Sequence, residues 1–452
     1  MADSPLCWSI AKLVDAYRRR DLSPVEVAEL AADRIEEVDA QLHAYLLCTP
    51  ELALEQARSA EEVYHGGTAG PLAGVPMSIK DAFHIEGIVT TVGSLAHVGD
   101  VARADSGAVR RLREAGAVFV GKTNTPEFCQ SATTDNLLGP DTTNPWDPAR
   151  TSGGSSGGAA ASVTAATCTA ALGSDGGGSI RIPAAFCGVV GVKPTYGSVQ
   201  DEGGFKGYSP FICAGPLARS VQDAATVLDV LRGVKGADPV PNESLRVGWS
   251  PAPGNHPVDR GVAQVLREAV DRIAALGHST IEVDLDLSGW EQVFGPLLLE
   301  EEGRRRGHLL DGPHGLTDYQ RRTLEAAREL DRSSVIEARL GHEAYRHRID
   351  ALFEHHDVLA LPATATTAFE LGQRPATIDA RRVSRLWGAF PFTAAFNVSG
   401  HPGVVLPVGL SDGLPVALQL VGRRGDETTM LLLAAQLESA LDLNLIDVLE
   451  GR

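Results

Sequence analysis

The sequence predicts a mixed α/β fold, in which helices flank a β-sheet. Residues 75–79 and 117–120 are short apolar runs typical of buried strands, and residues 106–115 between them have the pattern of a helix. The order strand, helix, strand recurs over residues 246–285. Two glycine-rich loops within residues 151–191 lie between apolar segments, which places them inside a core. Together these observations predict a sheet covered by helices.

The first 65 residues are predicted to be helical. Residues 23–26 read Ser-Pro-Val-Glu, a good helix start with Ser as N-cap, Pro at the first helical position and Glu at the third. Apolar side chains then recur at helical spacing, and the glycine pair at 66–67 ends the region. No polar linker divides the rest of the chain. We therefore expect residues 1–65 to pack on a single compact unit of residues 66–452.

The later elements continue the alternation of strand and helix. Further strands are expected at residues 358–362, 404–408 and 416–421, and helices at residues 220–232, 290–350 and 428–440. Within the long helical region, acidic residues 300–302 precede basic residues 304–306. This pattern predicts an exposed helix face with ion pairs one turn apart.

Charge and composition disfavour several classes of function. The chain of 452 residues has a formal net charge of −18, which disfavours nonspecific binding to nucleic acid or to an anionic membrane. No run of about 18 apolar residues predicts a membrane span, and the N-terminus lacks the basic-then-apolar layout of a secretory signal. The six cysteines show no CxxC spacing, which indicates free thiols in a reducing cytoplasm rather than disulfides or zinc.

The two glycine-rich loops hold the residues with the clearest chemistry. Residues 153–158 read Gly-Gly-Ser-Ser-Gly-Gly, and residues 173–179 read Gly-Ser-Asp-Gly-Gly-Gly-Ser. Successive N–H groups in a glycine-rich turn can converge on an anion. A serine at the end of such a turn can attack a carbonyl while these N–H groups bind the developing oxyanion. Flexible linkers have a similar composition, but the polar flanks of a linker are absent here.

These loops resemble the motifs of the amidase signature family of serine amidases. The family pattern runs from GGSSGG through a small-residue segment to G-(S/T)-D-x-G-G-S-I-R-x-P, which residues 173–183 match. Upstream, residues 74–81 match a third motif, G-(V/I)-P-x-x-(V/I)-K-D. The resemblance covers nearly the whole chain, more loosely over residues 235–385. It implies a mixed, largely parallel twisted sheet flanked by helices.

The resemblance implies a mechanism that uses two serines and a lysine. Ser179 would be the nucleophile, and Ser155, which follows a cis peptide bond after Gly154, would relay its proton to Lys80. A lysine acts as a base only when it is neutral, whereas an unperturbed lysine titrates near ~10.4. Burial at the end of an apolar strand can lower this pKa by several units. No metal or organic cofactor is implied.

The resemblance also assigns the backbone around the nucleophile. The N–H groups of Gly176, Gly177, Gly178 and Ser179 would form the oxyanion hole. Position 176 is commonly Thr, Ile or Val in the family. Glycine at this position predicts a more flexible loop, or more room beside the acyl group.

Five further side chains are expected to support the site. The resemblance implies that Asp175 and Arg181 form an ion pair that holds the nucleophile loop. It also makes Ser156 a supporting residue. Cys129 and Gln130 are expected to line the substrate pocket.

Three other motifs have competing interpretations. Residues 116–123 match the nucleotide-binding pattern G-x-x-x-x-G-K-[ST], but their four middle residues are apolar and β-prone, which indicates a core strand. Residues 153–157 match the nucleophile elbow G-x-S-x-G, but we expect no strand directly before them. His355 and His356 precede Asp357, and a solvated helix end is favoured there over a metal site.

We expect an amidase that hydrolyses a carboxamide to an acid and ammonia or an amine, with small or medium, apolar or aryl amides as substrates. One alternative is the glutaminase subunit of a tRNA-dependent amidotransferase. Such subunits usually carry Met-Gly-Ser where this chain has Cys-Gln-Ser at residues 129–131. Another alternative is ester or carbamate hydrolysis by the same three residues. Apart from a small-molecule amide, the one partner expected is a second copy of the chain in a possible homodimer.

Overall fold

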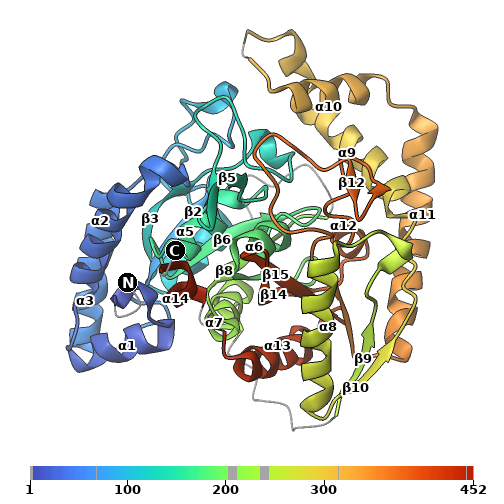
Figure 1. Cartoon of the computed structure of the whole chain (residues 1–452). Coiled ribbons are helices and arrows are strands. Elements are labelled where there is room, and N and C mark those ends of the chain that lie inside the picture. Colours follow the sequence, from blue (N-terminus) through green and yellow to red (C-terminus); the bar gives the residue numbers. More distant parts are fainter. Residues whose placement is uncertain are drawn as a thin grey trace.

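An 11-stranded sheet with helices on both faces forms the centre of the molecule (Figure 1). This arrangement, seen in a computed structural model, confirms the predicted mixed α/β class. The structure describes residues 4–67, 69–201, 211–234, 244–313, 315–443 and 445–450.

The strand order in the sheet is β1-β3-β2-β6-β8-β7-β14-β15-β11-β9-β10. Pairing is parallel in two groups, β3-β2-β6 and β11-β9-β10, and antiparallel between the other neighbours. The strands are β1 (Tyr45–Cys48), β2 (Pro76–Lys80), β3 (Val118–Thr123), β6 (Ala170–Asp175), β7 (Val190–Lys193), β8 (Cys213–Ala218), β9 (Arg246–Trp249), β10 (Ser279–Glu282), β11 (Val358–Pro362), β14 (Gly403–Ser411) and β15 (Leu414–Gly422).

Alternate residues of a strand face two separate apolar cores. On β6, Leu172 packs in a core that includes residues of α4, α7, α8 and α13, whereas Ala171 packs in a core with α1, α2, α3, α5 and α6. The helices are α1 (Ile10–Arg19), α2 (Pro24–Leu42), α3 (Pro50–Gly66), α4 (Gly107–Glu114), α5 (Gly157–Thr164), α6 (Arg181–Cys187), α7 (Val221–Arg232), α8 (Arg260–Ala275), α9 (Trp290–Arg306), α10 (Asp318–Arg328), α11 (Arg332–Ala351), α12 (Ala394–Val398), α13 (Glu427–Leu441) and α14 (Leu445–Glu450).

The N-terminal segment is helical, as predicted, except for one strand. α2 begins with the expected capping box, in which the Ser23 N–H donates to the Glu26 carboxylate at 2.8 Å. Between α2 and α3, however, β1 pairs antiparallel with β3. The segment therefore supplies an edge strand of the central sheet, which the helical pattern around it did not indicate.

The helices α9, α10 and α11 form a layer beside the sheet (Figure 1, yellow and orange). The predicted exposed ion pairs of α9 are only partly present. Arg304 pairs with Glu301 near the surface. Glu302 and Arg306 pair in the interior instead, and Gln130 donates to Glu302 at 3.3 Å. One charged pair of α9 thus belongs to the interior beside the predicted substrate pocket.

Two of the competing motifs form strands. β3 includes Gly, Lys and Thr at residues 121–123, so the nucleotide-binding match is a core strand, as predicted. The prediction that no strand precedes the first glycine loop was wrong. The strand β5 (Asp147–Thr151) lies directly before this loop. It pairs with β4 (Thr143–Asn144) in a separate hairpin outside the central sheet, because the polar, proline-containing sequence closes into a short turn.

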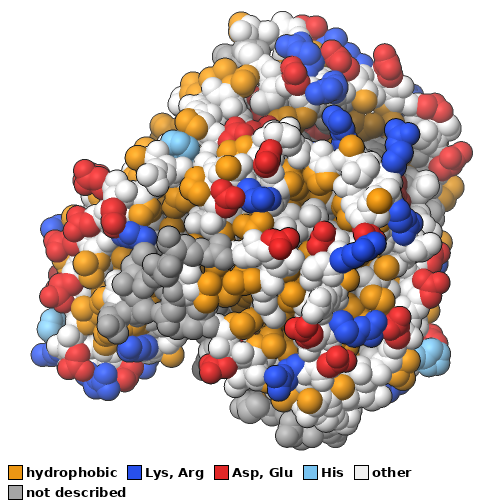
Figure 2. Space-filling model, in the orientation of Figure 1, with side chains coloured by type: hydrophobic (Ala, Val, Ile, Leu, Met, Phe, Trp, Pro, Cys, Tyr) orange, Lys and Arg blue, Asp and Glu red, His pale blue; other side chains and the backbone are white. Residues whose placement is uncertain are grey.

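No helix in the described part of the chain is long and apolar enough to cross a membrane. Among the same residues, no group of three or more His, Cys, Asp or Glu side chains could hold a metal ion. Asp357 instead pairs with Arg246 at 2.8 Å and with Arg423 at 3.0 Å. No disulfide bond joins the six cysteines, all of which lie within the described ranges. On the face shown in Figure 2, acidic and basic side chains are interspersed.

Candidate active site

Lys80 is the last residue of β2 and lies at the centre of a cluster of serine hydroxyls. Because β2 and β6 are parallel neighbours, their carboxyl ends meet at one edge of the sheet. Lys80 Nζ is within hydrogen-bond distance of Oγ of Ser155 (2.6 Å), Ser156 (3.0 Å) and Ser174 (3.0 Å). Ser174, on β6, was not predicted to reach the lysine, although it lies within the second glycine motif.

The Lys80 amino group has no carboxylate at hydrogen-bond distance among the described residues, and it contacts three neutral hydroxyls instead. The side chain is wholly buried. Burial lowers the pKa of Lys80, while the neighbouring Cys129 and Asp175 act more weakly in the opposite direction. The shift makes the neutral amine more accessible than in a free lysine, which is the direction expected from the sequence.

The first glycine loop brings Ser155 to the lysine. The Gly154–Ser155 peptide is cis, as the resemblance implied, and Gly153 has φ +78°. A side chain at Gly154 would collide with the Thr133 carbonyl group, so glycine is required for this close approach. The N–H of Ser156 donates to the carbonyl oxygen of Ser179 at 3.0 Å. The two glycine loops are therefore joined directly beside the predicted nucleophile.

The second glycine loop places Ser179 just before α6. Asp175, at the end of β6, accepts hydrogen bonds from the N–H groups of Gly178 (2.8 Å) and Ile180 (3.1 Å). The N–H group of Gly178 therefore already has a protein acceptor, the Asp175 carboxylate. The amides of Gly176, Gly177 and Ser179 make no such bond within the described residues.

Arg181 and Asp175 form the ion pair that the resemblance implied, and both side chains are fully buried. The guanidinium is bidentate, with Nε–Oδ2 and Nη2–Oδ1 distances of 2.9 Å. It also donates to the side chains of Gln419 (2.7 Å) and Asn397 (2.5 Å). Burial alone would raise the pKa of Asp175, but the Arg181 charge holds it well below its usual range. This network fixes the second glycine loop to β15 and α12.

Replacing Arg181 by methionine is expected to lower the free energy of unfolding by about 3–5 kcal/mol, because the Asp175 carboxylate stays buried without its counter-ion. Urea unfolding at neutral pH measures this loss. Arg304→Met is the matched control, since Arg304 pairs with Glu301 at the surface, and a change below about 1 kcal/mol is expected there. Equal losses in the two variants would contradict the structural role of the buried pair.

A cavity of about 1430 Å³ opens onto the serine cluster. This volume exceeds the ~300–1,000 Å³ of most ligand pockets, so the cavity can hold more than a small amide. Its wall includes Ser155, Ser174 and Ser179, and also Cys129 and Gln130, the two predicted pocket residues.

One wall of the cavity beside the second glycine loop is aromatic. A side chain at Gly177 would lie 3.2 Å from the ring of Trp387 and 3.5 Å from that of Phe294. The two rings meet edge to face at 5.9 Å. A side chain at Gly176 would lie 2.9 Å from Ile212. The expectation of extra room at Gly176 is therefore not met, because Ile212 fills that space.

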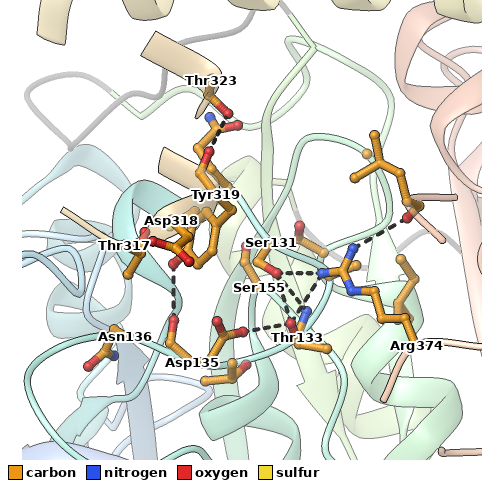
Figure 3. Close-up of a pocket in the computed structure, with 18 of the residues that line it drawn as sticks. Ser131, Thr133, Asp135, Asn136, Ser155, Thr317, Asp318, Tyr319, Thr323 and Arg374 are labelled. Atoms are coloured by element: carbon orange, nitrogen blue, oxygen red, sulfur yellow. Dashed lines mark hydrogen bonds between the residues drawn. The ribbon is translucent and has the colours of Figure 1, made fainter. Parts of the chain in front are cut away.

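Several cavity residues lie far from the glycine motifs in sequence and were missed. Tyr319, on α10, donates from its hydroxyl group to the Asp135 carbonyl oxygen at 3.0 Å (Figure 3). Arg374 projects into the cavity from the segment before β12 (Thr377–Ile378). No local sequence pattern connects these residues with the two loops.

The amidase family model matches residues 26–431. The chain belongs to the amidase signature family. This amidase is 34% identical to a glutamyl-tRNA(Gln) amidotransferase subunit of Carboxydothermus hydrogenoformans, over 95% of this chain and 96% of the relative. It is 36% identical to the subunit of the same name from Moorella thermoacetica, over 95% of this chain and 96% of that relative.

Solved structures show the same relationship. A crystal structure described as an amidase superposes with a TM-score of 0.89 at 31% identity, over 96% of this chain and 99% of that one. A bacterial aryl acylamidase of the amidase signature family superposes with a TM-score of 0.88 at 27% identity, over 99% of this chain and 100% of the acylamidase. This amidase is accordingly a hydrolase that acts on amide C–N bonds.

Proposed function

We propose that this amidase cleaves a carboxamide through an acyl-enzyme on Ser179, with Ser155 as proton relay and Lys80 as base. The observation that carries the proposal is the 2.6 Å contact between Lys80 Nζ and Ser155 Oγ in a fully buried setting. A buried lysine whose pKa is lowered supplies a base where no histidine lines the described cavity.

The reaction begins with attack of Ser179 Oγ on the substrate carbonyl carbon. The hydroxyl proton passes to Ser155 Oγ, and the Ser155 proton passes to neutral Lys80. The oxyanion is bound by the amides of Gly176, Gly177 and Ser179, because the Gly178 amide already donates to Asp175.

The tetrahedral intermediate then collapses and the C–N bond breaks. Lys80 returns a proton through Ser155 to the leaving nitrogen, so that ammonia or an amine departs. Water attacks the acyl-enzyme with the same groups as base, and the acid leaves with Ser179 restored. The Ser179 hydroxyl proton leaves with the amine in the first half-reaction, and water supplies the proton that restores Ser179 in the second, so Lys80 ends each half-reaction neutral.

A second candidate function concerns whether the protein acts alone or as a subunit of a complex. The curated relatives are named as subunits of glutamyl-tRNA(Gln) amidotransferase and align over 93–96% of this chain. They favour a role as the glutaminase subunit of such a complex more strongly than a stand-alone role. The aryl acylamidase and the peptide amidase among the structural neighbours support the stand-alone role. A cytoplasmic location and a homodimer stay predictions.

The test measures ammonia or amine release from L-glutamine, from aliphatic amides and from aryl amides, with a matched ester beside each amide. The purified chain is assayed alone and after co-expression with the genes that flank its own. Turnover of an aliphatic or aryl amide by the chain alone supports the stand-alone role. Turnover of glutamine that requires the co-expressed proteins supports the glutaminase role. Absence of release in both settings, with no fluorophosphonate adduct on Ser179, contradicts the proposed function.

A further inference from the structure

Arg374 lines the cavity and has hydrogen-bond donors without an acceptor among the described residues. Its Nη2 donates to Ser131 Oγ at 2.6 Å and to Thr133 Oγ1 at 3.2 Å, and its Nη1 makes a long bond of 3.4 Å to the Leu386 carbonyl oxygen (Figure 3). A guanidinium group carries five N–H donors. Two of the five therefore have no protein acceptor within the described part of the chain.

The Arg374 charge also lacks an ion-pair partner. No carboxylate of the described residues lies within ion-pairing distance of it; its polar contacts are two hydroxyls and one carbonyl. Asp135 is near, but its Oδ1 accepts the Thr133 hydroxyl proton at 2.6 Å. Burial lowers the pKa of Arg374, opposed by Asp135 and Tyr319. The buried Arg181, in contrast, forms an ion pair with Asp175.

Ser131 and Thr133, which hold Arg374, belong to the 131–134 loop, and this loop is fixed to the first glycine loop. Thr134 Oγ1 donates to the Gly153 carbonyl oxygen at 2.8 Å and accepts from the Gly157 N–H at 3.2 Å. The Thr133 backbone packs directly against Gly154. Figure 3 shows Arg374 directed toward Ser131 and Thr133, on the side of the cavity that holds Ser155. The guanidinium is thus held at a defined position relative to the reacting groups.

We infer that Arg374 binds a carboxylate at the end of the substrate remote from the scissile amide, so that the preferred substrates are carboxamides that carry a carboxylate. The inference rests on the proposed function. A guanidinium matches a carboxylate with two parallel hydrogen bonds, and such bonds gain strength away from water. The aromatic wall formed by Trp387 and Phe294 can pack against the carbon chain between the two ends of the substrate.

The test compares monoamides of dicarboxylic acids of four to six carbons with the diamides of the same acids. In each pair the carboxylate is replaced by a neutral group of similar shape. We expect the wild type to have a kcat/KM at least ~10-fold higher for the monoamide. Arg374→Gln is expected to lower kcat/KM for the monoamide by ~10–100-fold and to change that for the diamide by less than ~3-fold. Arg374→Lys, which keeps the charge, is expected to retain part of the preference.

The control is Arg382→Gln, an exposed arginine on β13 (Arg381–Arg382) that does not line the cavity, and it should leave both values unchanged. Equal loss on both substrates in Arg374→Gln would assign the residue a structural role and overturn the inference. So would a wild type that labels at Ser179 and cleaves amides without preferring the monoamide. A folded wild type that neither labels nor cleaves any amide would overturn the proposed function as well.

Discussion

Replacing Ser179 by alanine is expected to lower kcat for amide hydrolysis by about 10⁴-fold or more, since the acyl-enzyme cannot form. Any remaining rate would come from substrate binding and from the oxyanion-hole amides, which the variant keeps. The effect is measured from initial rates on whichever of the amides named under Proposed function the wild type cleaves fastest.

The matched control for this prediction is Ser162→Ala, which also removes a buried serine hydroxyl group. Ser162 lies in α5, and its Oγ donates to the Ala159 carbonyl oxygen at 2.8 Å, away from the cavity. Intact-protein mass spectrometry after fluorophosphonate treatment should show one adduct on the wild type and on the control, and none on Ser179→Ala. A Ser179→Ala variant with more than about 1% of the wild-type rate would rule out Ser179 as the nucleophile.

Replacing Lys80 by methionine is expected to lower kcat by about 10³-fold, because the relay loses its base while the buried volume is nearly conserved. The wild type is also expected to show a characteristic pH dependence. Burial lowers the pKa of Lys80, and the base acts in its deprotonated form. The value of kcat/KM should therefore rise with pH through this lowered pKa and reach a plateau above it.

Lys80→Met should abolish this rise and leave a low, flatter profile. Lys122→Met serves as the control, because Lys122 is a buried lysine on the neighbouring β3 whose charge pairs with Asp81 at 2.7 Å. This control should reduce stability and leave the shape of the pH profile unchanged. A wild-type kcat/KM that falls as pH increases over the same range would show that the essential group acts protonated, contrary to the assignment of Lys80 as base.

Much of the fold and of the site could be predicted because the information is contiguous in the chain. The apolar run before Lys80 forms β2, and the Ser-Pro-Val-Glu cap begins α2. The strand β1 was missed because four residues between two helices carry little local signal, and their pairing with β3 is a long-range event. The burial of Glu302 beside Gln130 was missed for a similar reason, since a helical charge pattern does not report what packs on the helix.

The sequence by itself determined the family and the two glycine loops, and it singled out Ser179, Ser155 and Lys80 as candidate reacting groups. This was possible because each motif is a short pattern of neighbouring residues. Only the tertiary structure decided that Ser174 also contacts the lysine and that Arg374 enters the cavity. These contacts join residues up to about 240 positions apart, such as Arg374 and Ser131. Their geometry follows from how β6, the 131–134 loop and the segment before β12 pack together, which local sequence patterns do not encode.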